Sequence, residues 1–281
     1  MPSKKIALVI GWGSVKCAAA LGLLRVLNRE GISLDMVVGS GGGSIFAALI
    51  ALGYDSAQIV EMNARLWTGE VTSRNRRGAA LRLLMPSSFQ PGRYFSLKDD
   101  RLVNARLRAA FGERRFEDTE IPLFISATDY RTGDQVILSE GSLYAAVRAS
   151  IALPMIFPPV MHDGRLLVDG FLSEPFPVGV AVQEGADIIL AMGFDSTFRS
   201  PVRSLSEYLL HISGILSNNL FQSSYAFYSL AHHSEVVPFV PQLAPDIGFF
   251  DTSRVPEIIA AGESEGEKQL PFLKKLLEET E

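Results

Sequence analysis

The chain has 281 residues and a formal net charge of −5, with 47% hydrophobic and 20% charged residues. This composition can bury a sizeable core, which excludes a disordered chain, and the acidic balance argues against a nucleic-acid partner. The one cysteine, Cys17, excludes an internal disulfide and indicates a reducing compartment, so we expect a cytoplasmic protein.

The first third of the chain alternates apolar runs with helical patterns. Residues 6–10 form an unbroken apolar run, as expected of a strand buried on both faces. A glycine turn follows, and then a helix is predicted over 15–29. A second short strand is predicted at 35–38, a second glycine turn at 39–43 and a second helix at 44–52. This alternation predicts a parallel sheet covered by helices.

The middle of the chain, about 55–118, is polar and rich in arginine, above all over 72–86. We interpret it as a solvated insertion; the alternative is a cap that shapes access to a site and contacts anionic lipid. The apolar runs of the chain are far shorter than the ~20 residues that span a bilayer. Peripheral membrane contact is therefore left open.

The strand pattern returns after the middle. Apolar runs at 123–127 and 135–138 flank a Thr-Gly-Asp turn, which predicts a hairpin. Further strands are predicted at 166–168, 187–191 and 235–240, and helices at 211–230 and 256–277, the last broken or bent near Pro271. Because no linker divides the chain, we predict one domain over 1–281, with a core over about 6–195 and C-terminal helices.

Three corners that carry glycine follow predicted strand ends. The first is Gly-Trp-Gly-Ser-Val-Lys at 11–16, the second is Gly-Ser-Gly-Gly-Gly-Ser at 39–44, and the third is Asp-Gly-Phe at 169–171. In the first two, backbone N–H groups at a helix N-terminus can bind a phosphate or stabilise an oxyanion. Asp169 is either a functional carboxylate at a strand end or an ordinary turn residue.

Nucleotide-binding patterns fit the first corner poorly. Lys16 stands where the third glycine of a dinucleotide fingerprint belongs, and Asp35 opens the second strand instead of ending it. The phosphate-binding loop pattern fails because Cys17 follows the lysine. Nucleotide binding is the least favoured alternative, and we expect no metal and no cofactor.

Taken together, the three corners resemble the patatin-like phospholipase family. There a Gly-rich loop supplies an oxyanion hole, a Gly-x-Ser-x-Gly turn carries the nucleophile, and an Asp-Gly pair supplies the general base. Segments 122–129, 147–159 and 181–187 resemble the segments that flank these motifs in the family. The resemblance covers most of 6–195 and implies a three-layer α/β/α sandwich with a mainly parallel central sheet.

The resemblance also implies roles for individual residues. Gly41 falls at the nucleophile position and Asp169 on the general base. The oxyanion loop comprises Gly11, Gly13, Ser14, Val15 and Lys16; the remaining motif positions are Gly39, Ser40 and Gly43 of the elbow and Gly170 and Phe171 after the aspartate. Trp12, Cys17 and Phe171 replace smaller residues of the family pattern, and the first two crowd the oxyanion loop.

Because Gly41 stands at the nucleophile position, this chain lacks the serine hydroxyl that attacks the substrate in the family. An elbow residue adopts a positive φ, which glycine does without strain, so the fold should stay intact. Ser40 and Ser44 are weaker candidates, because a shift of register turns the side chain away from the base. Cys17 and the four histidines are weaker still. Either the serine was removed from an active enzyme, which the otherwise complete site favours, or a natural relative lost catalysis.

The sequence therefore predicts an acyl-ester hydrolase for phospholipid or lysolipid that is inactive as it stands. The alternative is a non-catalytic protein that binds lipid or acyl groups in the same pocket. In both cases the expected partner is a lipid or another acyl ester.

Overall fold

The computed structural model describes residues 4–67, 96–98, 100–194, 205–231 and 233–278. The Arg-rich segment 72–86 lies outside them. The described strands are β1 Ile6–Ile10, β2 Met36–Ser40, β3 Leu123–Asp129, β4 Gln135–Leu138, β5 Val160–His162, β6 Arg165–Asp169, β7 Ile188–Met192 and β8 Glu235–Phe239. They form one sheet, in which neighbours hydrogen-bond in the order β5-β6-β3-β2-β1-β7-β8 and β4 also pairs with β3. Strands β1, β2, β3, β7 and β8 run parallel, so the predicted mainly parallel sheet is confirmed.

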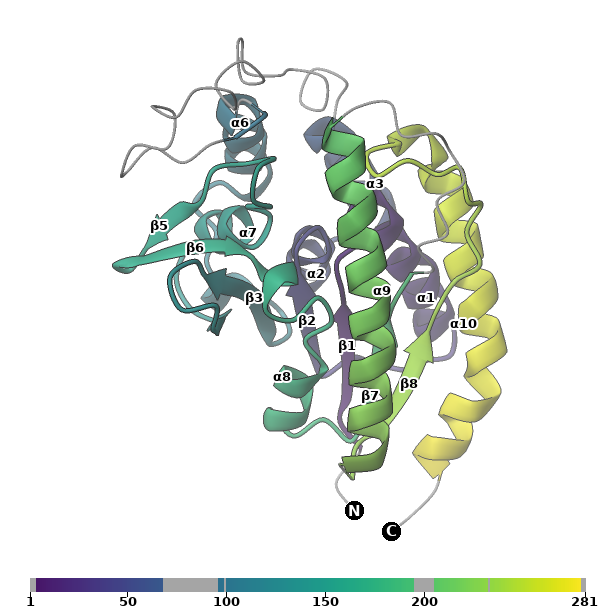
Figure 1. Ribbon diagram of the computed structural model, residues 1–281. Helices are drawn as coiled ribbons and strands as arrows, with labels where there is room; N and C mark the ends of the chain where they lie inside the picture. Colours follow the sequence, from purple (N-terminus) through teal and green to yellow (C-terminus); the bar gives the residue numbers. More distant parts are fainter. Residues whose placement is uncertain (1–3, 68–95, 99, 195–204, 232, 279–281) are drawn as a thin grey trace, which may run out of the picture.

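Helices cover both faces of this sheet. The α-helices are α1 Ala19–Arg29, α2 Gly43–Ala51, α3 Ser56–Leu66, α6 Asp100–Phe111, α7 Leu143–Ser150, α8 Val178–Gln183, α9 Leu205–Ala231 and α10 Val255–Glu278. Short 3-10 helices are η1 Ser14–Ala18, η3 Phe116–Asp118, η4 Gly170–Leu172 and η5 Thr252–Arg254. Leu8 of β1 packs in the core with α1, α2 and α10, whereas the adjacent Val9 packs with α8 and α9. Figure 1 shows α8 and α9 in front of the sheet and α1 and α2 behind it, which is the expected three-layer sandwich.

Strands β2 and β6 approach each other end to end along one edge of β3. β2 runs parallel to β3, and its last pair joins Ser40 to Ser126. β6 runs antiparallel to β3, and its last pair joins Asp169 to Ala127, while β4 occupies the opposite edge. The carboxyl ends of β2 and β6 therefore meet at adjacent residues of β3. This meeting places position 41 beside Asp169.

Several predicted elements are confirmed and others are corrected. The hairpin is present as β3 and β4, whereas β5 was not predicted. The helix expected over 15–29 begins as the 3-10 turn η1, because Lys16 N–H donates to Gly13 O three residues back. Of the expected break or bend near Pro271, the break is wrong, since α10 continues through this residue. Proline removes a hydrogen bond to the carbonyl four residues earlier, and that residue, Glu267, has a half-exposed side chain that water can reach.

The described ends of the region 55–118 pack against the main core. Ile59 and Leu66 of α3, and Leu107 and Phe111 of α6, are buried in the same cluster as β1. Helices α3 and α6 therefore pack on the core of the sandwich, whereas most of the segment between them lies outside the described residues. A search of the described helices finds none with the length and apolar character needed to cross a membrane.

Candidate active site

The second glycine corner is a sharp turn between β2 and α2. Gly41 has a φ of +55°, in the left-handed region that favours glycine. Its N–H donates to Ser150 Oγ at 3.0 Å, and its carbonyl accepts from the N–H and the Oγ of Ser44 at 3.0 and 2.6 Å. Hydrogen bonds thus hold both sides of the turn, with position 41 at its tip.

Close backbone packing explains the glycines that flank the turn. A Cβ at Gly43 would lie 2.3 Å from Ile10 O, and a Cβ at Gly39 would lie 2.7 Å from Ala47 Cβ. Helix α2 therefore starts directly against β1 and β2. Its N-terminus, the positive end of the helix dipole, lies at the site.

Asp169 is the carboxylate of the site. A Cβ at position 41 would lie 3.0 Å from Asp169 Oδ1. The side chain is buried, and Oδ1 accepts a hydrogen bond from Phe171 N–H at 2.9 Å. Burial raises the pKa of Asp169 to about 8, and the Phe171 hydrogen bond opposes that rise. A base whose pKa lies near neutral pH is well suited to general acid–base chemistry. The next residue, Gly170, has no room for a side chain, because a Cβ there would lie 2.4 Å from Ser126 O.

Trp12 occupies the space into which a side chain at position 41 would point. A Cβ there would lie 2.6 Å from Trp12 Cδ1. The indole is buried between two rings, with centroid distances of 5.0 Å to Phe171 and 4.5 Å to Phe249. The backbone N–H of Trp12 donates to Pro175 O at 3.0 Å. The crowding expected at Trp12 therefore falls on the nucleophile position itself.

The predicted oxyanion loop packs directly on the elbow, since a Cβ at Gly42 would lie 2.6 Å from Ser14 Cα. Two of its N–H groups are engaged: Val15 N–H donates to Phe249 O at 3.4 Å and Lys16 N–H to Gly13 O at 3.1 Å. The backbone N–H groups of Gly13 and Ser14 remain the candidate oxyanion donors. The loop lies tightly against the core, because a Cβ at Gly11 would meet Phe176 Cδ1 at 2.1 Å and one at Gly13 would meet Phe194 Cε2 at 2.3 Å.

The alternative nucleophiles are engaged in holding backbone. Ser40 Oγ donates to Glu174 O at 3.2 Å, and Ser44 Oγ donates to Gly41 O at 2.6 Å. Cys17 Sγ–H donates to Gly11 O at 3.4 Å, and burial raises the pKa of this thiol far above neutral. A thiol nucleophile acts as the thiolate, so Cys17 has no nucleophilic form at neutral pH.

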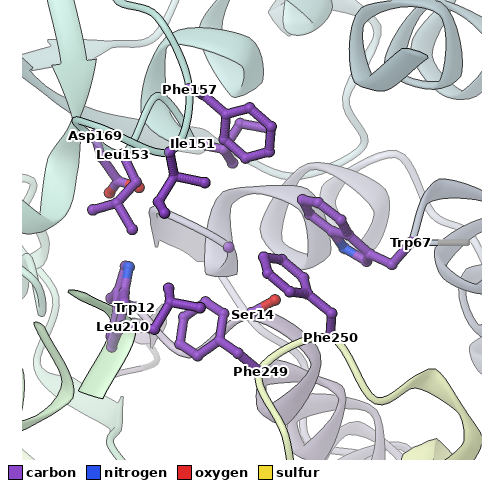
Figure 2. A pocket seen from close by; sticks show the side chains of 12 residues that line it. Trp12, Ser14, Trp67, Ile151, Leu153, Phe157, Asp169, Leu210, Phe249 and Phe250 are labelled. Atoms are coloured by element: carbon purple, nitrogen blue, oxygen red, sulfur yellow. The ribbon is translucent and has the colours of Figure 1, made fainter. Parts of the chain in front are cut away.

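A small apolar cavity adjoins these residues (Figure 2). Its lining comprises Trp12, Ser14, Gly42, Trp67, Ile151, Leu153, Ile156, Phe157, Asp169, Leu210, Phe249 and Phe250. The cavity holds about 20 Å³, which is room for roughly one water molecule. Ser14 Oγ and Trp67 Nε1 are buried in this lining and make no hydrogen bond to any described residue. Ser14 has in addition a φ of +50°, unusual for a residue other than glycine.

Sequence reasoning missed most of this lining. Trp67, Leu210, Phe249 and Phe250 are apolar residues from segments far apart in the chain, and they carry no motif. Only the packing of α3, α9 and the segment before η5 brings them together. No pattern in the sequence identifies them as pocket residues.

Comparison with known proteins places the chain. The family model described as patatin-like phospholipase matches residues 8–182. An uncharacterised NTE family protein of Mycobacterium bovis is 31% identical over 201 residues, which is 72% of this chain and 52% of that protein. A lysophospholipase of Yarrowia lipolytica is 29% identical over 197 residues, 70% of this chain and 13% of that protein. The chain thus spans about half, or far less, of these relatives.

A solved structure shares the fold. The crystal structure of VipD from Legionella pneumophila matches with a TM-score of 0.52 at 13% identity, covering 96% of this chain and 67% of that chain. The family resemblance expected from the three corners is confirmed by the match over 8–182. This chain belongs to the patatin-like phospholipase family.

Proposed function

We propose that this chain binds an acyl lipid in a patatin-type site that no longer hydrolyses it. Asp169 is the base of a Ser-Asp dyad whose serine is replaced by Gly41, and the Gly13 and Ser14 amides are the oxyanion donors. With a serine at position 41, Asp169 would take the hydroxyl proton while the oxygen attacked the ester carbonyl, and the amides would hold the resulting oxyanion. Without that oxygen, no acyl-enzyme forms.

One observation carries this proposal. A Cβ at position 41 would lie 3.0 Å from Asp169 Oδ1 and would collide with Trp12 Cδ1 at 2.6 Å. The first distance supports a dyad position, and the second supports a site adapted to lack the serine. Because Trp12 is packed between Phe171 and Phe249, it cannot be displaced cheaply. This packing favours natural loss of the nucleophile over its removal from an otherwise active enzyme.

The lining supports an acyl ligand with a polar acceptor. The walls are aliphatic and aromatic, as an acyl chain requires, and two buried donors, Ser14 Oγ and Trp67 Nε1, lack partners among the described residues. An ester or carboxylate oxygen would satisfy such donors. A relative named as a lysophospholipase agrees with this class of ligand. Entry of an acyl chain requires the aromatic rings to move, because the cavity holds only about 20 Å³.

The catalytic half of the proposal is tested by restoring the serine with and without Trp12. The unaltered chain and Gly41→Ser should neither react with a fluorophosphonate probe nor hydrolyse p-nitrophenyl esters. The double variant Trp12→Gly/Gly41→Ser should be labelled by the probe and should hydrolyse the esters, because it has the nucleophile and the space for it. Loss of a nucleophile costs up to about a millionfold in turnover, so the gain should be large. Adding Asp169→Asn should abolish the restored activity, and Trp12→Gly alone is the matched control. A folded double variant that stays unlabelled would contradict the dyad, as would labelling of the unaltered chain.

The binding half is tested by intrinsic fluorescence. The chain has two tryptophans, and both line the cavity. A short-chain lysophosphatidylcholine, added as a monomer, should change the emission in a saturable way. Trp12→Phe and Trp67→Phe would assign the signal to each ring. Emission that stays constant throughout the titration would refute lipid binding at this site.

A further inference from the structure

Helix α9 exposes a stripe of large apolar side chains on its outward side, among which the exposed polar residues Asn219 and Ser223 also lie. The apolar members have exposed fractions between 39% and 89% and are Leu205, Tyr208, Ile212, Ile215, Leu216, Leu220, Phe227 and Leu230. Residues on the opposite side, such as Phe221 and Ser217, are buried against the molecule. Large apolar side chains gathered on an exposed surface are typical of a site that contacts a protein or a membrane. Figure 1 shows α9 on the near side of the molecule, in front of β1 and β7.

Charge is nearly absent from this helix. Glu207 and His211 are its only ionisable residues besides tyrosines, and it contains no lysine or arginine. A partner held by ion pairs is therefore not indicated. The surface fits a partner that offers apolar contact.

The stripe is continuous with the candidate site. A groove of about 280 Å³ lies between α9 and η4; it is lined by Leu216, Asn219, Leu220 and Ser223 of α9 and by Phe171 and the half-exposed Leu172 of η4. Phe171 in turn packs against Trp12, and Leu210 of α9 lines the inner cavity. A ligand that moves inward from the outer surface of α9 would therefore contact Phe171 and then Trp12, which lies beside position 41.

We infer that the α9 stripe docks this chain on the surface of a zwitterionic lipid bilayer. The inference rests on the proposed acyl-lipid ligand for one point only, namely why the stripe should adjoin the site. A helix with an apolar side can lie in the bilayer interface without shape complementarity. A second copy is a poorer fit: a helix of 27 residues is about 40 Å long and about 10 Å wide, which offers about 400 Å² per partner against the ~800 Å² of a stable interface.

The first test measures binding of the whole chain to vesicles of diether phosphatidylcholine, which contain no ester to hydrolyse. The unaltered chain should co-sediment with them, equally at low and high salt, because the stripe has no basic residue. Ile212→Gln/Leu216→Gln/Leu220→Gln should reduce the partition coefficient about tenfold or more, since less apolar surface leaves water. Met161→Gln/Phe272→Gln, at exposed apolar residues of β5 and α10, is the matched control and should retain binding.

A second test does not depend on the triple variant folding. Cys17, the only cysteine, is buried, so a polarity-sensitive thiol dye can be attached at one new site. Dye on Leu216→Cys should shift its emission to the blue when vesicles are added, and dye on Met161→Cys should not. Binding that requires anionic lipid, or a dimer in solution that the triple variant converts to a monomer without any vesicle binding, would overturn the inference. Tryptophan emission with monomeric lysolipid reports on the pocket independently, so either proposal can fail alone.

Discussion

Asp169 is a carboxyl group held away from water, and this makes the stability of the fold depend on pH. Burial raises the pKa of Asp169 to about 8 in the folded chain, whereas an unfolded aspartate titrates near 3.9. Between about pH 4 and pH 8 the folded state therefore keeps a proton that the unfolded state has lost. The free energy of unfolding should fall as pH rises through this window, by up to about 1.4 kcal/mol per pH unit.

We predict that Asp169→Asn flattens this dependence. The amide has a similar shape and no charge, so the variant should gain stability relative to the unaltered chain as pH rises from about 5 to about 8. Urea unfolding at intervals across this range measures the difference. Glu174→Gln is the matched comparison: burial raises the pKa of Glu174 to about 7, so its effect should level off about one pH unit earlier. Parallel curves for Asp169→Asn and the unaltered chain would contradict the prediction.

At the scale of residues, the sequence predicts the motif positions but not what fills the space between them. The glycine spacing and the strand-end aspartate identify positions 41 and 169, and the structure brings these positions together. The sequence predicts that Trp12 crowds the site, but not that its indole occupies the space beside position 41. The position of the indole depends on packing against Phe249, which comes from a distant part of the chain. Ser14 illustrates the same limit: its hydroxyl has no partner among the described residues, and this follows from tertiary packing alone.

At the scale of elements, α1 and α10 cross with their backbones in contact. A Cβ at Gly22 would lie 2.1 Å from Ile259 O, and a Cβ at Gly262 would lie 2.1 Å from Ala19 O. We predict that Gly22→Ala or Gly262→Ala destabilises the protein by about 3 kcal/mol, because overpacking against backbone outweighs the ~1 kcal/mol that alanine gains in a helix. Thermal and urea unfolding of each variant measure the change.

Gly266 of the same helix α10 provides the control. A Cβ there would meet only side-chain atoms, Val26 Cγ2 at 3.1 Å and Leu23 Cδ1 at 3.4 Å. Gly266→Ala should therefore change stability far less than Gly262→Ala. Equal losses at the two positions would show that backbone contact is not the cause.

Elements with strong local signals were predictable, and those defined by tertiary contacts were not. The hairpin β3–β4 has a turn sequence of its own, and β1 has an unbroken apolar run. Strand β5 has three residues, none of them fully buried, so no periodicity marks it. The sequence predicts a break or bend at Pro271 because local propensity takes no account of tertiary packing, and α10 continues through this residue.

At the scale of the molecule, the sheet extends beyond the part that the family model matches. The match ends at residue 182, before β7 begins at Ile188. Yet β1 lies between β2 and β7, and all five residues of β1 are buried. Helix α10 covers α1 on the outside through the glycine contact. The sequence predicted one domain over the whole chain, and this pairing explains why the C-terminal part should be needed.

We predict that residues 1–183 alone do not fold. Removing β7, α9, β8 and α10 would expose one edge of β1 and the apolar side of α1, and an unpaired buried edge invites aggregation. The fragment should be insoluble or should lack a cooperative unfolding transition, as measured by solubility after expression, circular dichroism and urea titration. A chain that ends at Glu278 keeps every described element and should unfold cooperatively. A soluble fragment 1–183 with a cooperative transition would show that the N-terminal part is a domain by itself, and that the C-terminal strands only extend it.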